Sequence, residues 1–317
     1  MRVLNFGSLN IDYVYQVDHF VQPGETEAAS SHQIFAGGKG LNQSLAMARA
    51  GLDVTHAGMI GPEGDFLVRT LADSGVKTDR IGRVSAPTGH AIIQVDRAGR
   101  NCILIFGGAN REINTAVIDS ALSGFGDGDL LVLQNEIAGI CEIMQKAHQR
   151  GMKIVFNPAP FTAEIAAYPL RLVDIFVVNE VEAAALTASN VSASQRPEAF
   201  PAQLSPLPSG ASTALSAELR MAINTLSDRF PSALLIVTLG EHGSLAVQNG
   251  KEIFQPAFKV NAVDTTAAGD TFLGYFIAGL SENRGLKASL ELAARSSALC
   301  VSRKGASDSV PFRKELL

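Results

Sequence analysis

Short apolar runs alternate along the chain with longer stretches in which apolar residues recur every three or four positions. The short runs predict buried β-strands and the longer ones amphipathic helices, a rhythm that is typical of βαβ units. The predicted strands are Val3–Phe6, Val54–Met59, Leu130–Leu133, Ile154–Phe156, Ile175–Val178, Leu234–Val237 and Ser244–Val247. The predicted helices, each followed by a glycine as a common helix stop, are Asn42–Ala50, Phe66–Ser74 and Gly139–Arg150. Because the strands are almost continuously apolar, we expect a mostly parallel sheet with helices on both faces.

Three stretches interrupt this rhythm. Residues Tyr13–Phe35 and Thr88–Phe106 predict strands and turns without a helix, and the second contains a hairpin pattern with Gly99 in its turn. They predict a small accessory sheet placed where it could cover a site, with two ordinary surface hairpins as the alternative. The stretch Ala188–Ser216 holds four of the thirteen prolines, which predicts a flexible insertion. It is a loop and not a linker between domains, since the α/β rhythm resumes at Glu218.

Composition excludes several classes of protein. With 26 Lys and Arg against 31 Asp and Glu, the net charge is −5, which argues against a basic nucleic-acid surface. The amino terminus shows no signal-peptide pattern, and no apolar run reaches the ~18 residues that a membrane span requires. The cysteines Cys102, Cys141 and Cys300 are odd in number and far apart, which excludes a disulfide framework and a zinc ribbon. We therefore expect a cytoplasmic protein with no nucleic-acid or membrane partner.

The strongest chemical motif is the segment Asp264–Phe272, DTTAAGDTF, which leads into an apolar helical run. Small residues at a helix start leave backbone N–H groups free at its positive end, and Ala267, Ala268 and Gly269 would not block a phosphate from reaching them. Asp270 in the first turn would face the same space and could accept a proton from an attacking hydroxyl. A capping Asp among small packing residues is the alternative, but two acids around an Ala-Ala-Gly tripeptide favour the functional interpretation.

A second glycine cluster covers Ala36–Gln43, AGGKGLNQ. It is no Walker A loop because Lys39 is followed by Gly40, and it is no dinucleotide fingerprint because the third glycine would fall on Gln43. Its functional interpretation is a backbone that lets a polyol approach closely, with Lys39 and Asn42 supplying hydrogen bonds.

Polar clusters also follow three of the predicted strands. They are Gly7–Asp12 after the first strand, Asn179–Glu182 after Ile175–Val178, and Thr238–Gly243 after Leu234–Val237. Each alone is more often a structural cap. All three, however, fall at carboxyl ends of strands, where open α/β sheets bind ligands.

Together these residues resemble the ribokinase-like (PfkB) carbohydrate kinases. The resemblance runs through GSLNID, PGET, AGGKGLNQ, QNE, NPAP, VNEVEA, VTLGEHG, VDTTAAGDTF and VSRKGASDSVP, and the specific motifs are DTTAAGD and GGKGLN. It implies one domain over residues 1–317 with a three-layer α/β/α fold, a mostly parallel central sheet and a small β-sheet lid. The lid would come from segments near 13–35 and 88–106. A flexible insertion would lie near 188–216. Two copies of the protein could form a homodimer through the lid.

The resemblance implies that ATP phosphorylates the primary hydroxyl of a sugar. D-ribose is the first candidate, giving ribose 5-phosphate, because Asn10 and Asp12 could bind adjacent secondary hydroxyls. Fructose, a sugar acid or a nucleoside remain open as acceptors. A sugar-binding regulator on the same fold is the alternative from another class, although a binder has no use for the Asp270 base beside an anion hole. A nicotinamide-dependent enzyme is the most distant alternative.

The resemblance also implies roles for individual residues. Asp270 would be the general base, with the backbone amides of Ala267, Ala268, Gly269 and Asp270 as the anion hole. Sugar contacts would come from Asn10, Asp12, Gly38, Lys39, Asn42 and Glu136. Nucleotide contacts would come from Asn179, Thr238, Gly240 and Gly243, with Glu182 organising Mg²⁺ through water. A K⁺ site would be formed by Asp264 and Ser309 with backbone carbonyls of Thr266, Cys300, Arg303 and Gly305. One departure is Ala294, which stands where relatives often place a polar residue near adenine.

Overall fold

A nine-stranded sheet forms the centre of the molecule. The computed structural model describes residues 1–188 and 215–316, so the expected insertion near 188–216 lies almost wholly outside the described residues. The strand order is β13-β12-β11-β10-β9-β8-β1-β4-β5. Neighbouring strands run parallel from β5 to β11, and β12 and β13 at one edge pair antiparallel. The prediction of a mostly parallel sheet is therefore confirmed.

All seven predicted strands are present, and each of their ends lies within a residue of its expected position. The strands of the central sheet are β1 (Val3–Phe6), β4 (Val54–Ile60), β5 (Lys77–Arg83), β8 (Leu130–Gln134), β9 (Lys153–Asn157), β10 (Ile175–Asn179), β11 (Leu234–Thr238), β12 (Ser244–Gln248) and β13 (Lys251–Gln255). The strands β5 and β13 were not predicted. Both lie at edges of the sheet, where little surface is buried, and their charged residues leave no apolar run to detect.

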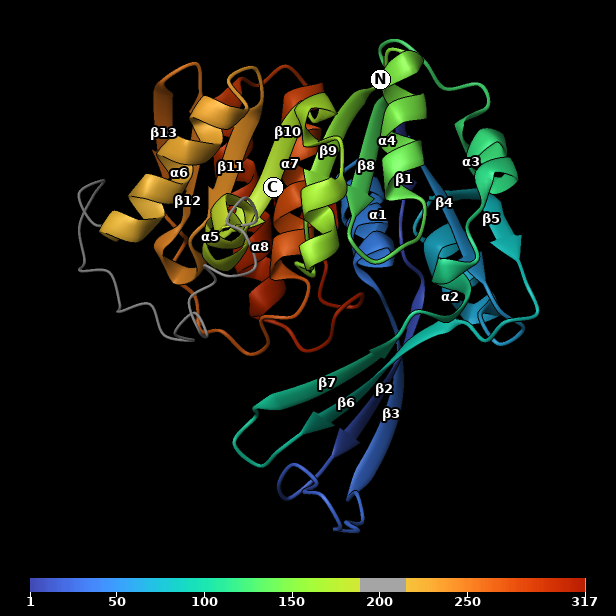
Figure 1. Ribbon diagram of the computed structural model, residues 1–317. Coiled ribbons are helices and arrows are strands. Elements are labelled where there is room, and N and C mark those ends of the chain that lie inside the picture. Colours follow the sequence, from blue (N-terminus) through green and yellow to red (C-terminus); the bar gives the residue numbers. More distant parts are fainter. Residues whose placement is uncertain (189–214, 317) are drawn as a thin grey trace.

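Helices cover both faces of this sheet (Figure 1). One apolar core joins the sheet to α3 (Thr115–Leu122), α4 (Ile140–Gln149), α5 (Glu180–Ala188) and α6 (Ala217–Arg229). A second core joins the opposite face to α1 (Lys39–Arg49), α2 (Asp65–Asp73), α7 (Ala268–Ser281) and α8 (Leu286–Val301). Short 3₁₀ turns occur at Gly108–Arg111, Ala163–Ala167, Leu170–Leu172, Gly240–His242 and Arg313–Glu315. The three-layer architecture expected from the sequence is confirmed.

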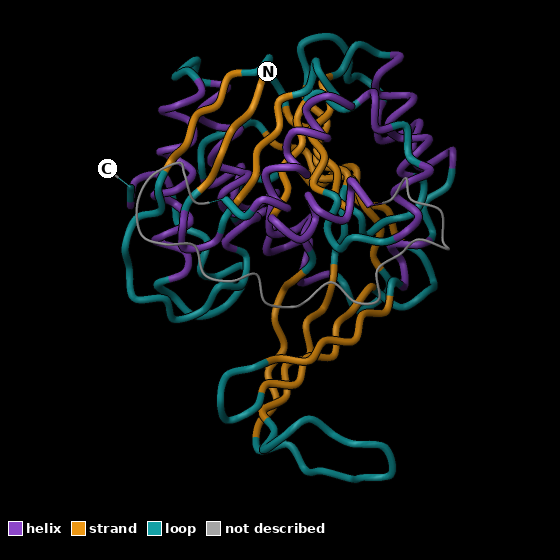
Figure 2. The backbone as a smooth tube through the Cα atoms, turned by 60° about the vertical axis from the view of Figure 1, so that its left-hand side comes forward, coloured by secondary structure: helices purple, strands orange, loops and turns teal. Residues whose placement is uncertain are grey.

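A separate four-stranded sheet projects from the body as a twisted arm (Figures 1 and 2). Its order is β3-β2-β6-β7, and its strands are β2 (Asn10–Gln16), β3 (Ser31–Gly37), β6 (Gly89–Val95) and β7 (Asn101–Phe106). The two segments that were expected to form an accessory sheet therefore pair with each other. We call this four-stranded sheet the lid, for the role that we propose for it below.

The register of the lid assigns its side chains to two faces. Tyr13 lies opposite Ile34 and Ile92, and Ile92 lies opposite Leu104, so this row shares one face. The neighbouring row, Phe35, Asp12, Ala91 and Ile105, points to the other face. We call the face that carries Asp12 the inner face and the opposite one the outer face.

Within residues 1–188 and 215–316, no helix has both the length and the apolar composition needed to cross a membrane.

Candidate active site

The predicted site residues meet where the parallel strands end and two helices begin. Glu136 follows β8, Asn157 and Asn179 are the last residues of β9 and β10, and Thr238 is the last residue of β11. The helices α1 and α7 start at the same edge with Lys39 and Ala268. Side chains far apart in the sequence thus share one rim, as expected for the carboxyl ends of a parallel sheet.

The start of α7 has the geometry of an anion-binding turn. Ala267, the N-cap, adopts a left-handed conformation with φ 60°, which is uncommon for a residue with a side chain. The first intrahelical bond runs from the Thr271 amide to the Ala267 carbonyl at 2.8 Å, and the Ala268 amide donates to Thr265 at 3.3 Å. The amides of Gly269 and Asp270 therefore lie in the first turn, where a helix leaves its N–H groups unpaired. Apart from its chain neighbours and the nearby backbone of its own helix, no atom of the described residues lies within 4 Å of where a Gly269 side chain would begin, so an anion can approach.

Asp270 is buried next to this turn, with 7% of its surface exposed. Its Oδ1 accepts a hydrogen bond from Gln43 Nε2 at 2.8 Å, and its Oδ2 accepts one from Asn42 Nδ2 at 3.3 Å. Burial lowers the pKa of the nearby Lys39, but the carboxylates of Asp270, Glu136 and Glu182 outweigh this effect and raise it. Lys39 thus remains a cation among three acids.

The sugar side of the predicted site is built around two carboxyl groups. The Asp12 carboxyl lies over Gly37, where any side chain would overlap it. Burial, together with the charge of Glu136, raises the pKa of Asp12 to about 7. Glu136 Oε2 accepts hydrogen bonds from the Ser8 hydroxyl and, at 2.9 Å, from the Lys39 amide. Burial raises the pKa of Glu136 in spite of these donors.

Asn10 is held in place by a residue that the sequence did not reveal. Asn110 Nδ2 donates to Asn10 Oδ1 at 2.8 Å, and Asn110 Oδ1 accepts from the Leu9 amide at 3.1 Å. Asn110 follows the second lid hairpin in the sequence GGAN, a weak signal on its own. Gly38, with φ 94°, precedes α1, and this helix begins three residues earlier than predicted because the apolar periodicity starts only at Leu41.

Asn179 and Glu182 cap the first turn of α5. Asn179 Oδ1 accepts from the Glu182 amide at 2.8 Å, while the Glu182 carboxylate accepts from the Asn179 backbone and side chain at 3.0 and 3.1 Å. The motif therefore forms a reciprocal helix cap, and its role toward a nucleotide stays a prediction. Glu182 also lies 3.5 Å from Asn157 Nδ2, and burial raises its pKa despite the Asn179 amide and Lys39.

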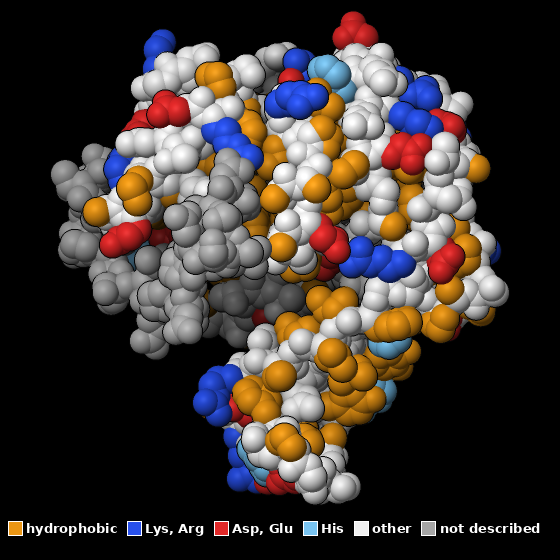
Figure 3. Space-filling model, in the orientation of Figure 1, with side chains coloured by type: hydrophobic (Ala, Val, Ile, Leu, Met, Phe, Trp, Pro, Cys, Tyr) orange, Lys and Arg blue, Asp and Glu red, His pale blue; other side chains and the backbone are white. Residues whose placement is uncertain are grey.

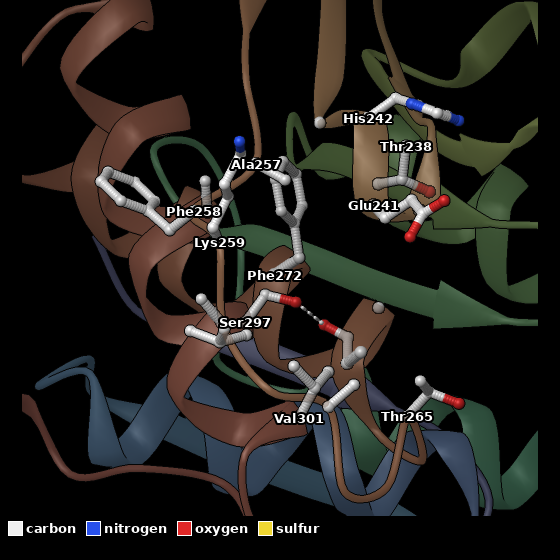
Figure 4. A pocket seen from close by; sticks show the side chains of 18 residues that line it. Thr238, Glu241, His242, Ala257, Phe258, Lys259, Thr265, Phe272, Ser297 and Val301 are labelled. Atoms are coloured by element: carbon white, nitrogen blue, oxygen red, sulfur yellow. Dashed lines mark hydrogen bonds between the residues drawn. The ribbon is translucent and has the colours of Figure 1, made fainter. Parts of the chain in front are cut away.

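A cavity of about 660 Å³ opens beside the start of α7 (Figure 4). Thr238, Gly240 and Gly243, three of the predicted nucleotide contacts, line it together with Ala268 and Gly269. Asn179 is not among the lining residues. The cavity is therefore continuous with the anion-binding turn.

The far end of this cavity is mostly apolar. Ala294 lines it, in agreement with the departure noted in the sequence, next to Ala298 and Val301. The Ser297 hydroxyl donates to the Ala268 carbonyl at 3.0 Å, which fixes α8 against the start of α7 (Figure 4). At the opposite rim, Gly243 has φ 121°, and a side chain there would overlap the Gln255 carbonyl.

The predicted cation-binding segments, one just before α7 and the other at the end of α8 and beyond it, lie together. Asp264 Oδ1 accepts from the Thr266 amide and hydroxyl at 2.9 and 2.6 Å, and Asp264 Oδ2 accepts from the Gly305 amide at 3.0 Å. Burial raises the pKa of Asp264, but these donors outweigh it and the net shift is downward. Cys300 Sγ lies 3.1 Å from Ser309 Oγ and 3.8 Å from the Thr266 carbonyl.

Arg303, the remaining residue of that group, turns its side chain outward to pair with Glu315 at 2.7 Å. Its amide donates to the Cys300 carbonyl at 3.1 Å, so its backbone forms a turn at the end of α8.

Two amide side chains, the buried Gln43 and the half-buried Asn157, connect the site and were not predicted as part of it. Gln43 bonds Asp270 although the two residues are 227 positions apart, and Gln43 Nε2 also donates to Asn157 Oδ1 at 3.1 Å. Gln43 was noted only because it breaks a dinucleotide motif, and Asn157 only as part of the NPAP motif.

Known proteins resemble this chain along its whole length. A family model described as pfkB family carbohydrate kinase matches residues 2–313. The ribokinase of Haemophilus influenzae is 35% identical over 98% of this chain and 95% of its own. A crystal structure of ribokinase from Cryptococcus neoformans in complex with ADP is 32% identical with a TM-score of 0.82, covering 99% of this chain and 98% of that one. Ribokinase of Arabidopsis thaliana complexed with ribose and ATP is 26% identical with a TM-score of 0.79, covering 99% and 97%. The chain belongs to the pfkB family of carbohydrate kinases.

Proposed function

We propose that this protein transfers the γ-phosphoryl group of ATP to the primary hydroxyl of D-ribose, giving ribose 5-phosphate and ADP. One observation carries the proposal. The buried Asp270 carboxylate stands between the sugar-side residues and the open first turn of α7, which continues into the cavity. The proposed base, Asp270, therefore lies next to both the proposed acceptor site and the anion-binding turn of α7.

In this scheme the acceptor hydroxyl gives its proton to Asp270 as its oxygen bonds to the γ-phosphorus, and the bond to the ADP oxygen breaks. Amides of the α7 turn would stabilise charge on the equatorial phosphoryl oxygens. Lys39 contributes a positive charge on the sugar side. Proton acceptance by a positioned carboxylate contributes on the order of 10²–10⁴-fold to such a rate.

The choice of ribose rests on the sugar side and on the ribokinases that this chain resembles. Asp12 lies against Gly37 and Asn10 against Gly89, and a side chain at either glycine would collide with the polar group beside it. The Asn42 Oδ1 atom is buried and has no hydrogen-bond partner among the described residues, so a sugar hydroxyl could satisfy it. These acceptors suit adjacent secondary hydroxyls.

Mg²⁺ and K⁺ belong to the proposal, and the residues present fit both. The described ranges contain no group of three or more His, Cys, Asp or Glu side chains that could hold a metal ion. That agrees with Mg²⁺ carried mainly by donor phosphates and water, with Glu182 as the protein carboxylate. Mg²⁺ would offset the charge of the phosphates. The hard oxygens near Asp264 fit a monovalent cation, which would stabilise the loop before α7.

We also propose that the lid closes over the sugar and that its outer face joins two copies of the protein.

We further propose that the protein acts in the cytoplasm. All three cysteines are free, which is consistent with a reducing compartment.

The test is ADP release by the purified protein with pentoses, hexoses, sugar acids and nucleosides, each with and without KCl. We expect ribose to give the highest kcat/KM. A nucleoside or hexose that exceeds ribose tenfold would overturn the choice of substrate. Asp270→Asn should lower kcat on the order of 10²–10⁴-fold with KM values little changed. If it keeps more than about a third of wild-type turnover, Asp270 is only a cap and the mechanism is wrong.

A further inference from the structure

The proposed catalytic carboxylate is held by two neighbouring residues of α1. Gln43 Nε2 donates to Asp270 Oδ1 at 2.8 Å, and Asn42 Nδ2 donates to Asp270 Oδ2 at 3.3 Å. Gln43 is completely buried, whereas Asn42 is 6% exposed. Gln43 therefore lies behind the carboxylate, on the side away from any substrate, and makes the shorter of the two bonds.

Gln43 is itself fixed at both ends. Its Oε1 accepts from Gln134 Nε2 at 2.6 Å, and its Nε2 also donates to Asn157 Oδ1 at 3.1 Å. A carboxylate can only accept, so the amide nitrogen must face Asp270. Turning the amide over would place its oxygen against two acceptors and its nitrogen against a donor, so this orientation is locked.

Further buried hydrogen bonds support Gln134. Its Nε2 donates to Asn5 Oδ1 at 2.9 Å, and Asn5 Nδ2 donates to Ser44 Oγ at 2.8 Å. The Ser44 hydroxyl lies 2.8 Å from His56 Nδ1, and burial lowers the pKa of His56 to about 4. The imidazole is therefore neutral and can accept from Ser44, so the bonds run from β4 through β1, β8 and α1 to the start of α7.

Through Asn157, the Gln43 amide is also connected to the proposed phosphate side of the site. Asn157 Nδ2 donates to the Val177 carbonyl at 2.9 Å and lies 3.5 Å from Glu182 Oε2. A rotation of Gln43 would therefore disturb both the base and the acid proposed to organise Mg²⁺.

We propose that Gln43 is a positioning residue that holds one oxygen of the Asp270 carboxylate so that the other is presented to the acceptor hydroxyl. This inference rests on the proposed function. Gln43 touches no substrate and acts only through Asp270. Because misplacement of a reacting group by about 1 Å can cost on the order of 10²-fold, losing the Gln43 bond reduces turnover more than binding.

The first test is Gln43→Met, which keeps a similar length but removes the amide. We expect kcat to fall about 10–100-fold, while KM for ribose and ATP changes less than about threefold. The matched control is Ser44→Ala, which breaks the same buried network one residue away without touching Asp270. It should lower the thermal unfolding temperature but leave kcat within about twofold.

The second test is Gln43→Glu, which keeps the shape and adds a carboxyl beside Asp270. An ionised Glu repels the base, whereas a protonated one can donate to it as the amide does. The activity of this variant relative to wild type should therefore rise as the pH falls from 8 to 6. Lys39, Glu136, Glu182 and Cys300 also act electrostatically on Asp270, so the profile is read only as a ratio to wild type.

The possible outcomes separate the inference from the function beneath it. No sugar turnover by the wild-type protein refutes the proposed function. Wild-type turnover with a folded Gln43→Met variant that keeps more than half of kcat refutes the positioning role alone. If Gln43→Met does not fold, a constant ratio of Gln43→Glu to wild-type activity across pH refutes it. An equal loss of kcat in Ser44→Ala assigns the effect to stability and refutes it too.

Discussion

Single residues in this site depend on neighbours that come from remote parts of the chain. Asp12 lies on the lid, and the charge of Glu136, which follows β8, helps to raise the pKa of its carboxyl. The motif GSLNID predicts a polar group at this place, but not its environment. Burial and a second carboxyl together raise the pKa of Asp12 to about 7, so the proposed sugar contact would be sensitive to pH near neutrality.

Asp12→Asn should weaken the apparent affinity for ribose by ~1.5–3 kcal/mol and leave that for ATP nearly unchanged, because a charge-assisted acceptor is lost. In wild type, Asp12 is ionised above its pKa of about 7, so the KM for ribose should fall as the pH rises from 6 to 8. The variant should lose this pH dependence. Steady-state kinetics at saturating ATP measure it, with Asp18→Asn, an exposed acid of the same hairpin, as the control. Equal weakening of ribose and ATP would contradict the assignment.

The same carboxyl has an opposite effect on stability. The pKa of Asp12 in the folded protein lies above its ordinary value of 3.8, so folded protein retains a proton that unfolded protein releases between pH 3.8 and about 7. Stability therefore decreases as the pH rises through this window. Asp12→Asn should unfold at a higher temperature than wild type at pH 8, with the difference shrinking at pH 4. If Asp12→Asn unfolds at a lower temperature than wild type at pH 8, the ionised Asp12 does not destabilise the folded protein and the prediction is wrong.

At the scale of elements, the sequence predicted what depends on local pattern. The strands that end at the site are apolar on both faces, and the small residues before α7 mark a helix start. Gln43 and Asn157 were not assigned because an amide on a helix or at a strand end has no distinctive spacing. Their roles depend on contacts between segments more than one hundred residues apart.

The loop before α7 gives the element-scale prediction. Asp264 joins Thr266 to Gly305, and a cation bound there would stiffen the turn that carries the anion-binding amides. KCl should raise wild-type activity over tetramethylammonium chloride at equal ionic strength, with Na⁺ less effective. Asp264→Ala should abolish this response and keep residual Mg·ATP-dependent activity. The control is Asp308→Ala, an exposed acid of the same segment. A flat response in wild type, or a retained one in Asp264→Ala, would contradict the proposed site.

At the scale of the molecule, the lid projects away from the body (Figure 2). Apolar side chains gather on it (Figure 3), and its outer face carries Ile34, Ile92 and Leu104 with 53%, 38% and 67% of their surface exposed. These three align in one row across the sheet through Tyr13. The inner face carries Asp12, the proposed sugar contact. Our proposal thus gives the two faces separate roles. Alternation in the sequence can suggest two faces, but only the strand register assigns each side chain to one of them.

This separation leads to the last prediction. Association of two lids through their outer faces would bury the exposed row and cover a surface that is otherwise prone to aggregate. Leu104→Asp places a charge in the centre of that contact and should convert a dimer to a monomer, as measured by light scattering after size-exclusion chromatography. The matched control is Ile103→Asp, which is next in the same strand, 50% exposed, and on the inner face. It should leave the mass of the assembly unchanged. A wild-type monomer at ~10 µM, or dissociation by Ile103→Asp alone, would refute association through the outer face, because a charge on the inner face lies outside the proposed contact.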